Sequence, residues 1–125
     1  MKRKNTMRSI ILNDYKTNKL PKHFKVYNIS NEKIEGLKDI KLLQLPKLYL
    51  KKFENGKITK EELEEQYFRG LDSRGQHLIS VDYNGDFLLC TCDSYNHKDN
   101  CAMKYLLKYM GLKNHKIESY KAMFA

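Results

Sequence analysis

The chain has 125 residues, of which 41% are hydrophobic and 31% charged, and its formal net charge is +9. This length suits one domain with a modest core, and no apolar run approaches the roughly 18 residues of a membrane-spanning helix. Three cysteines, an odd number, and a basic N-terminal stretch without a signal peptide's apolar core argue against secretion, so we expect a cytoplasmic, intracellular protein.

The positive charge is concentrated towards the two ends of the chain. Residues 1–25 hold eight basic residues and one acidic residue, residues 98–121 hold six lysines, and an acidic segment around Glu61 to Glu65 lies between them. Two basic surfaces suit a polyanion, so nucleic acid is the partner that the charge favours, although the same charges would also serve solubility alone. The composition suits a small basic protein from an archaeon or one of its viruses.

The first part of the chain is predicted to be a basic arm followed by a strand and a helix. Residues 1–20 form the arm, which we expect to be ordered in part through its Ile-Ile-Leu run. Residues 23–27 alternate as in a short strand. Ser30 or Asn31 would cap a helix, whose apolar positions are Ile34, Leu37 and Ile40.

Two further helices are predicted from their start signals. Pro46 suits the first turn of a helix that continues to Phe53, and the Asn-Gly pair after it would end that helix. Thr59 and Glu62 form a capping-box pattern for a third helix that runs to about Tyr67.

From residue 67 onwards the apolar pattern has a period of two, which is typical of strands. We expect strands over residues 67–71, 77–83 and 87–90, the last two joined by Asn84-Gly85, a strong hairpin signal. After Cys101 the apolar residues recur at helical spacing and predict a helix that ends near Gly111.

All three cysteines fall within the twelve residues from Cys90 to Cys101, and a polar loop with His97 lies between Cys92 and the last of them. Thiolates and an imidazole are the ligands of tetrahedral Zn²⁺ sites. We therefore expect Zn²⁺ as a cofactor, with Cys90, Cys92, His97 and Cys101 as its ligands. The alternative is that the cysteines are small buried apolar side chains and that His97 is a solvated surface residue, with no metal ion.

A strand that ends in Cys-x-Cys, a polar loop and a cysteine that opens an apolar helix resemble the SWIM zinc finger over about residues 66–111. That family's pattern is Cys-x-Cys, a variable loop, then Cys-x-His. Cys90 and Cys92 match its first pair and Cys101 its third ligand, while Met103 stands where the family has histidine. SWIM modules occur in transposases, chromatin-remodelling-type ATPases, ubiquitin-pathway proteins and recombinase-associated partners, so the resemblance implies DNA or protein binding.

Three possibilities remain open for the fourth ligand, because a thioether is a weak ligand for Zn²⁺. In the first, His97 completes a Cys₃His site whose spacing is that of a retroviral-type zinc knuckle with two spacers each one residue shorter. In the second, the finger is degenerate and metal-free, and Met103 packs in the core. In the third, another donor completes the shell: Asp93, Asp99, His115 or a water.

Together these elements predict an α+β fold, in which a small antiparallel β-hairpin or sheet accompanies short helices and the C-terminal half is a zinc-finger-like ββα unit. Three segments are expected. Residues 1–20 form the basic N-terminal arm, residues 21–65 a mainly helical part, and residues 66–125 a SWIM-like module that forms one compact domain with residues 21–65.

We expect a small zinc-binding protein that binds nucleic acid, in particular DNA, through its basic surfaces. The residues expected to contact phosphates are Lys2, Arg3, Lys4, Arg74, Lys104 and Lys108. The alternative is a protein–protein adaptor whose finger docks a recombinase or ATPase, through the acidic helix or an apolar face of residues 34–49. The chain lacks the phosphate-loop, nucleophile-elbow and His-Glu-x-x-His motifs, so we expect no enzyme activity, small-molecule substrate or membrane partner.

Overall fold

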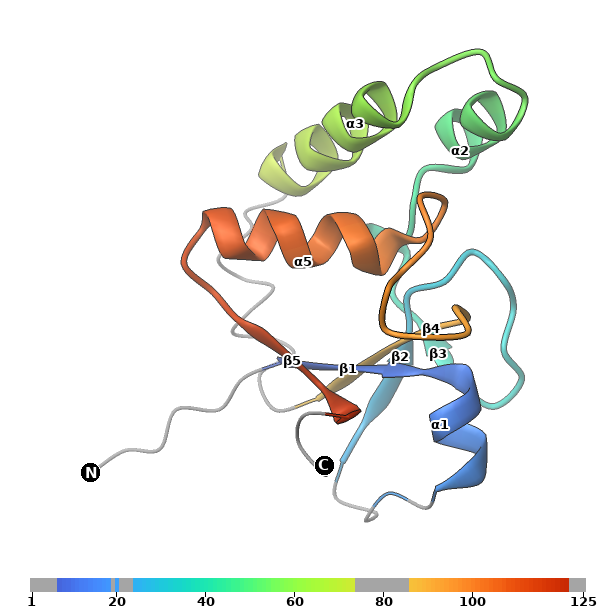
Figure 1. The fold of residues 1–125 in the computed structure, drawn as a ribbon, viewed down its shortest axis with the longest axis vertical. Helices are drawn as coiled ribbons and strands as arrows, with labels where there is room; N and C mark the ends of the chain where they lie inside the picture. Colours follow the sequence, from blue (N-terminus) through green and yellow to red (C-terminus); the bar gives the residue numbers. More distant parts are fainter. Residues whose placement is uncertain (1–6, 19, 21–23, 74–85, 122–125) are drawn as a thin grey trace.

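The computed structural model describes residues 7–18, 20, 24–73 and 86–121 (Figure 1). Its elements in chain order are β1 (Met7–Ile11), α1 (Leu12–Thr17), β2 (Val26–Asn28), β3 (Lys38–Asp39), the 3₁₀ helix η1 (Lys41–Leu43), α2 (Lys47–Glu54), α3 (Lys60–Ser73), β4 (Phe87–Cys90), α5 (Ala102–Leu112) and β5 (Ile117–Ser119).

Five short strands form one sheet in the order β3-β2-β4-β1-β5, and all four pairings between them are parallel. β4 is the central strand. It pairs on one side with β1, where Ile11 lies opposite Cys90, and on the other with β2, where Asn28 lies opposite Leu89. All four residues of β4 are buried, as expected of a parallel strand that is covered on both faces.

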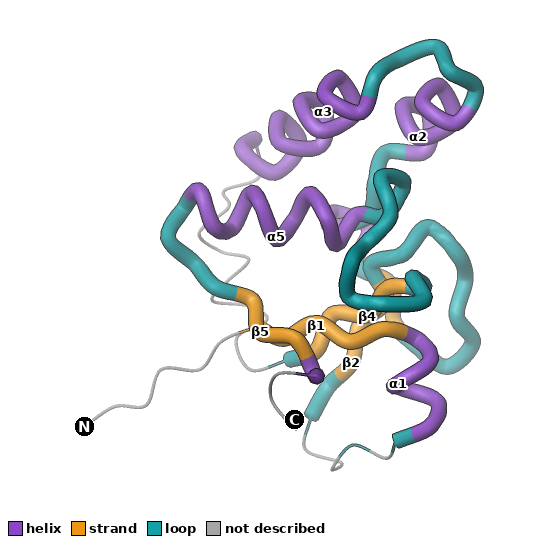
Figure 2. Tube along the Cα trace, in the orientation of Figure 1, coloured by secondary structure: helices purple, strands orange, loops and turns teal. Residues whose placement is uncertain are grey.

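Helices cover both faces of the sheet (Figures 1 and 2). α5 lies on one face, α3 packs over α5, and α2 lies beside α3, whereas α1 lies on the opposite side. The side chains of β4 alternate between the two: Leu88 and Cys90 belong to the large core cluster under α5, and Phe87 and Leu89 to a smaller cluster on the other face. This layering is that of an α/β fold.

The predicted α+β fold with an antiparallel hairpin sheet is therefore wrong. The Phe-Leu-Leu-Cys run of β4 is apolar at every position, and such a run is typical of a strand buried on both faces by helices rather than of a half-exposed hairpin strand. β4 lies between β1 and β2, so the N- and C-terminal parts of the chain share one sheet, and the latter is no separate ββα unit. The predicted turn at Asn84 and Gly85 and the strand before it lie outside the described residues.

The helix predicted from residue 30 onwards is also wrong, because residues 31–37 form turns and bends before β3 and η1. The side chain of Asn28 organises this segment. Its Nδ2 donates to the carbonyl of Glu32 at 2.8 Å, and its Oδ1 accepts from the N–H of Ser30 at 3.0 Å. Gly36 then turns the chain with a φ of 85°. Local side-chain bonds of this kind satisfy backbone groups that a helix would otherwise pair.

Two predicted helix starts are confirmed. α2 begins directly after Pro46, and Gly56, with a φ of 74°, follows its end. α3 begins at the predicted capping box, in which the N–H of Thr59 donates to Oε1 of Glu62 at 2.8 Å and the N–H of Glu62 donates to Oγ1 of Thr59 at 3.1 Å.

α3 continues through the segment predicted as a strand over residues 67–71, so that prediction is wrong. Leu63, Tyr67 and Leu71 lie four residues apart on one helical face, and all three are buried. The hydroxyl of Tyr67 donates to the carbonyl of Leu43 at 2.6 Å, which ties α3 to η1. In the part of the chain that the structure describes, no helix combines the length and the apolar character needed to cross a membrane.

Candidate metal centre

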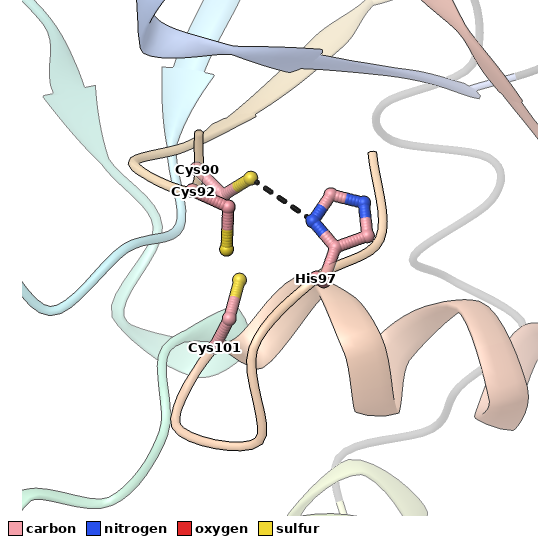
Figure 3. A group of neighbouring side chains, drawn as sticks. All are labelled: Cys90, Cys92, His97 and Cys101. Atoms are coloured by element: carbon pink, nitrogen blue, oxygen red, sulfur yellow. Dashed lines mark hydrogen bonds between the residues drawn. The ribbon is translucent and has the colours of Figure 1, made fainter. Parts of the chain in front are cut away.

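Four side chains of metal-ligating type meet at the carboxyl end of β4 (Figure 3). Cys90 is the last residue of β4, and Cys92 follows two residues later, which is the spacing that returns an extended chain to the same side. His97 lies in the loop that follows, and Cys101 is the N-cap residue of α5. Figure 3 shows the three sulfur atoms and the imidazole ring facing one another. A strand end, a loop and a helix start thus contribute one group.

The ligand atoms of the group all lie within 4.8 Å of one another. The Sγ of Cys90 is 3.3 Å from the Nδ1 of His97. Around a tetrahedral zinc ion with Zn–S bonds of about 2.3 Å, neighbouring sulfur atoms would lie about 3.8 Å apart. The side chains are almost wholly shielded, because none of the four residues is more than 9% exposed. This buried Cys₃His group can hold a metal ion after small inward shifts of its side chains.

Two thiols of the group, those of Cys92 and Cys101, ionise less readily than free thiols. Burial raises the pKa of the Cys92 thiol, although the backbone N–H of Lys98, which donates to its Sγ at 3.4 Å, opposes this shift. The pKa of Cys101 is raised to about 12, first by its hydrogen bond with Cys90 and then by burial. Adjacent buried thiols resist ionisation together, because their negative charges repel and lack water. A divalent metal ion supplies the compensating charge and lets coordinating thiols deprotonate.

Tyr95 holds the loop of residues 91–100, which we call the metal-site loop, against the start of the fold. Its hydroxyl donates to Oδ2 of Asp14 at 2.8 Å and accepts from the N–H of Ile11 at 3.3 Å. Its ring meets the imidazole of His97 edge to face, with 6.1 Å between the centroids. Sequence reasoning missed this role, because the partners of Tyr95 stand 81 and 84 positions earlier in the chain and no local pattern connects them.

Of the donors considered for the fourth position, His97 is the one that the structure places in the group. Met103 is fully buried and packs in the large core cluster. Asp93 is exposed, Asp99 forms an ion pair with Lys104, and His115 follows the far end of α5.

The two α5 lysines predicted to contact nucleic acid each lie beside a carboxylate. Lys104 pairs with Asp99, and the Nζ of Lys108 lies 2.9 Å from Oε2 of Glu64 on α3. The other predicted contacts lie outside the described residues: Lys2, Arg3, Lys4 and Arg74. The acidic helix α3 therefore neutralises part of the basic surface expected on α5.

The resemblance to the SWIM finger stays a prediction. The spacing of Cys90 and Cys92 and the helix that starts at Cys101 agree with its pattern, whereas the histidine of this group, His97, precedes the third cysteine instead of following it. No family model, no curated protein and no solved structure matches this chain.

Proposed function

We propose that this chain is a small zinc-binding protein in which a structural Zn²⁺ joins the end of β4 to the start of α5. The observation that carries the proposal is the set of four buried ligand atoms within 4.8 Å of one another. Three thiolates and an imidazole are donors that favour Zn²⁺ over harder ions such as Mg²⁺ or Ca²⁺. Four protein ligands fill a tetrahedral shell, which is typical of a structural site rather than of a catalytic one.

Such an ion would contribute to folding directly. The loop from residue 91 to residue 100 contains no helix or strand, so few backbone hydrogen bonds hold it. Zinc bonds from Cys90, Cys92, His97 and Cys101 would order this loop and fix where α5 begins. The free energy of metal binding then becomes part of the free energy of folding.

Elemental analysis of protein purified without added metal or chelator tests the zinc site. The wild type should carry about one zinc per chain. Cys101→Ser keeps the size of the side chain and removes a thiolate, so it should lose most of the metal, whereas His115→Ala, a histidine outside the group, should retain it. Metal-free wild type from fully reduced preparations, or a Cys101→Ser variant with full zinc content, would contradict the proposal.

We further propose that the protein binds nucleic acid through its basic surfaces. The support is the net charge of +9, since lysines that neutralise phosphates release counterions and so gain affinity. The competing adaptor function would use the acidic helix or the apolar face predicted over residues 34–49. Of that face, Ile40, Leu43 and Leu45 are buried in the chain's own core, whereas Leu48 is exposed.

Salt dependence separates nucleic-acid binding from an adaptor function. Affinity for an oligonucleotide should fall by about tenfold or more between roughly 50 and 200 mM salt, because the release of counterions becomes less favourable as the salt concentration rises. Fluorescence anisotropy with labelled DNA measures this fall. Absence of binding to DNA and RNA at low salt would exclude the nucleic-acid function but would not affect the proposal of a zinc site.

A further inference from the structure

A second feature of the fold lies outside the metal centre, where the segment from β3 to the start of α2 passes α3. A cavity of about 680 Å³ opens there. Lys33, Lys41 and Lys47 line it together with the apolar side chains of Leu42 and Pro46. Its volume suits a ligand of nucleotide size, since small-molecule sites measure about 300–1,000 Å³.

The lysines around this cavity carry charge that the fold leaves unpaired. Residues 32–60 contain eight lysines against four carboxylates. No lysine of this segment lies within ion-pair distance of an acidic group among the described residues, whereas Lys104, Lys108 and Lys113 of the α5 region all do. Among the described residues, the lysines of the cavity and of α2 therefore carry positive charge that no ion pair neutralises.

Two carboxylates also line the cavity, and each accepts a hydrogen bond from a neutral side chain. Oε2 of Glu32 accepts from Oγ1 of Thr91 at 2.7 Å, and Oδ1 of Asp39 accepts from Nδ2 of Asn28 at 2.9 Å. Each carboxylate thus has a hydrogen-bond partner on the protein, while the three lysines that line the cavity have no ion pair among the described residues.

We propose that this cavity binds a single strand of nucleic acid, with phosphates on Lys33, Lys41 and Lys47 and an unpaired base against Leu42 and Pro46. The inference rests on the proposed nucleic-acid function and gives it a place and a substrate class. A duplex is too wide to enter a cavity of about 680 Å³. Its bases are also paired and stacked inside the double helix, so they cannot pack against Leu42 and Pro46. Basic grooves with apolar or aromatic platforms are typical of single-strand binding.

The lysines of α2 extend the contact beyond one nucleotide. Lys51 is exposed, and Lys52 is half-buried with its ammonium 5.5 Å from the centre of the Tyr49 ring. Phosphates on either side of the bound nucleotide would meet these charges. A strand that follows the cavity and α2 therefore gains more than a free mononucleotide, which offers the same chemistry with fewer charges.

The test is fluorescence anisotropy of a labelled single strand of about 20 thymidines with the zinc-loaded protein. The cavity variant is Lys33→Ala/Lys41→Ala/Lys47→Ala. The matched control is Lys16→Ala/Lys116→Ala/Lys121→Ala, which removes the same charge from exposed lysines elsewhere. The cavity variant should bind at least about tenfold more weakly, with a salt slope reduced by about 2, and the control should stay within about threefold of wild type. Zinc content and circular dichroism should be unchanged in both variants.

Each other outcome overturns a stated part of the inference. Equal losses in the two variants would mean diffuse electrostatic attraction without a site. Tighter binding of the matched duplex would exclude the single strand, and equal competition by polyglutamate or by thymidine monophosphate would point to an acidic protein or a free nucleotide instead. Wild type that binds no oligonucleotide would remove the nucleic-acid function itself, whereas wild-type binding that the cavity variant keeps would remove this site alone.

Discussion

His97 and Met103 are two residues that the sequence offers for the position of the fourth ligand, and the structure places them differently. Met103 occupies the position of the SWIM histidine and is 0% exposed, whereas His97, six positions earlier, is 8% exposed with its Nδ1 3.3 Å from the Sγ of Cys90. The imidazole of the candidate metal centre therefore comes from a loop residue and not from a residue of α5. The backbone of α5 does not fix the imidazole, so its orientation depends on the loop and on the ring of Tyr95 beside it.

Replacing His97 by alanine should weaken zinc binding without removing it. Changes to groups that merely orient a ligand typically cost about 10–100-fold in metal affinity, so loss of a direct ligand should cost at least as much. Competition against a chromogenic chelator measures the dissociation constant, with His115→Ala as the control. Wild-type affinity in His97→Ala would mean that three thiolates and a water hold the ion.

At the scale of elements, α3 holds α5 in place from outside. The rings of Phe68 and Tyr109 pack with centroids 5.1 Å apart, and the hydroxyl of Tyr109 donates to Oδ1 of Asp72 at 2.6 Å. The ion pair between Lys108 and Glu64 adds a third link between the two helices. Since α5 starts at Cys101 of the candidate metal centre, the outer helix supports that group indirectly.

The capping box of α3 provides a test of that support. Thr59→Ala removes the hydroxyl that accepts from the N–H of Glu62, so the free energy of unfolding should fall by about 1 kcal/mol. Urea denaturation of the zinc-loaded protein measures the change. Thr59→Ser keeps the hydroxyl and should recover most of the loss, and an equal loss in the serine variant would show that the cap does not act through its oxygen.

At the scale of the whole molecule, β4 joins the sheet to the candidate metal centre. This strand is hydrogen-bonded to β1 and β2 on either side and ends in Cys90, one of the four candidate ligands. A metal ion held by this group would therefore be attached directly to the central strand of the sheet. Binding of an ion to the folded state alone stabilises the entire protein by mass action.

Thermal and urea unfolding at buffered free zinc should reveal this coupling. Once free zinc exceeds the dissociation constant, each tenfold rise should add about 1.4 kcal/mol to the free energy of unfolding, and a chelator should lower the melting temperature. Buffering with magnesium at the same concentrations is the control, because that ion disfavours thiolate ligands. A melting temperature that changes with neither zinc nor chelator would show that the fold is stable without a metal ion.

Features that depend on neighbouring residues could be predicted from the sequence, and those that depend on distant ones could not. The capping box at Thr59 and Glu62 and the assembly of His97 with the cysteines involve residues within twelve positions of one another. The sheet involves pairs such as Arg8 and Phe87. The apolar run of β4 is compatible with either strand direction, so only its distant partners decide between a hairpin and a parallel sheet.

The strand order also determines when the sheet can form during synthesis of the chain. Both neighbours of β1 in the sheet, β4 and β5, come from the last third of the chain, and β2 reaches β1 only through β4. A nascent chain that has been synthesised up to α3 therefore carries an apolar strand with no partner, for seconds at ordinary rates of translation. The four candidate ligands lie at the end of β4 and directly after it in the chain, so under the proposed zinc site the central strand and the zinc ligands become available at almost the same moment. Closure of the sheet and capture of the metal would thus form one late, concerted event in its biogenesis.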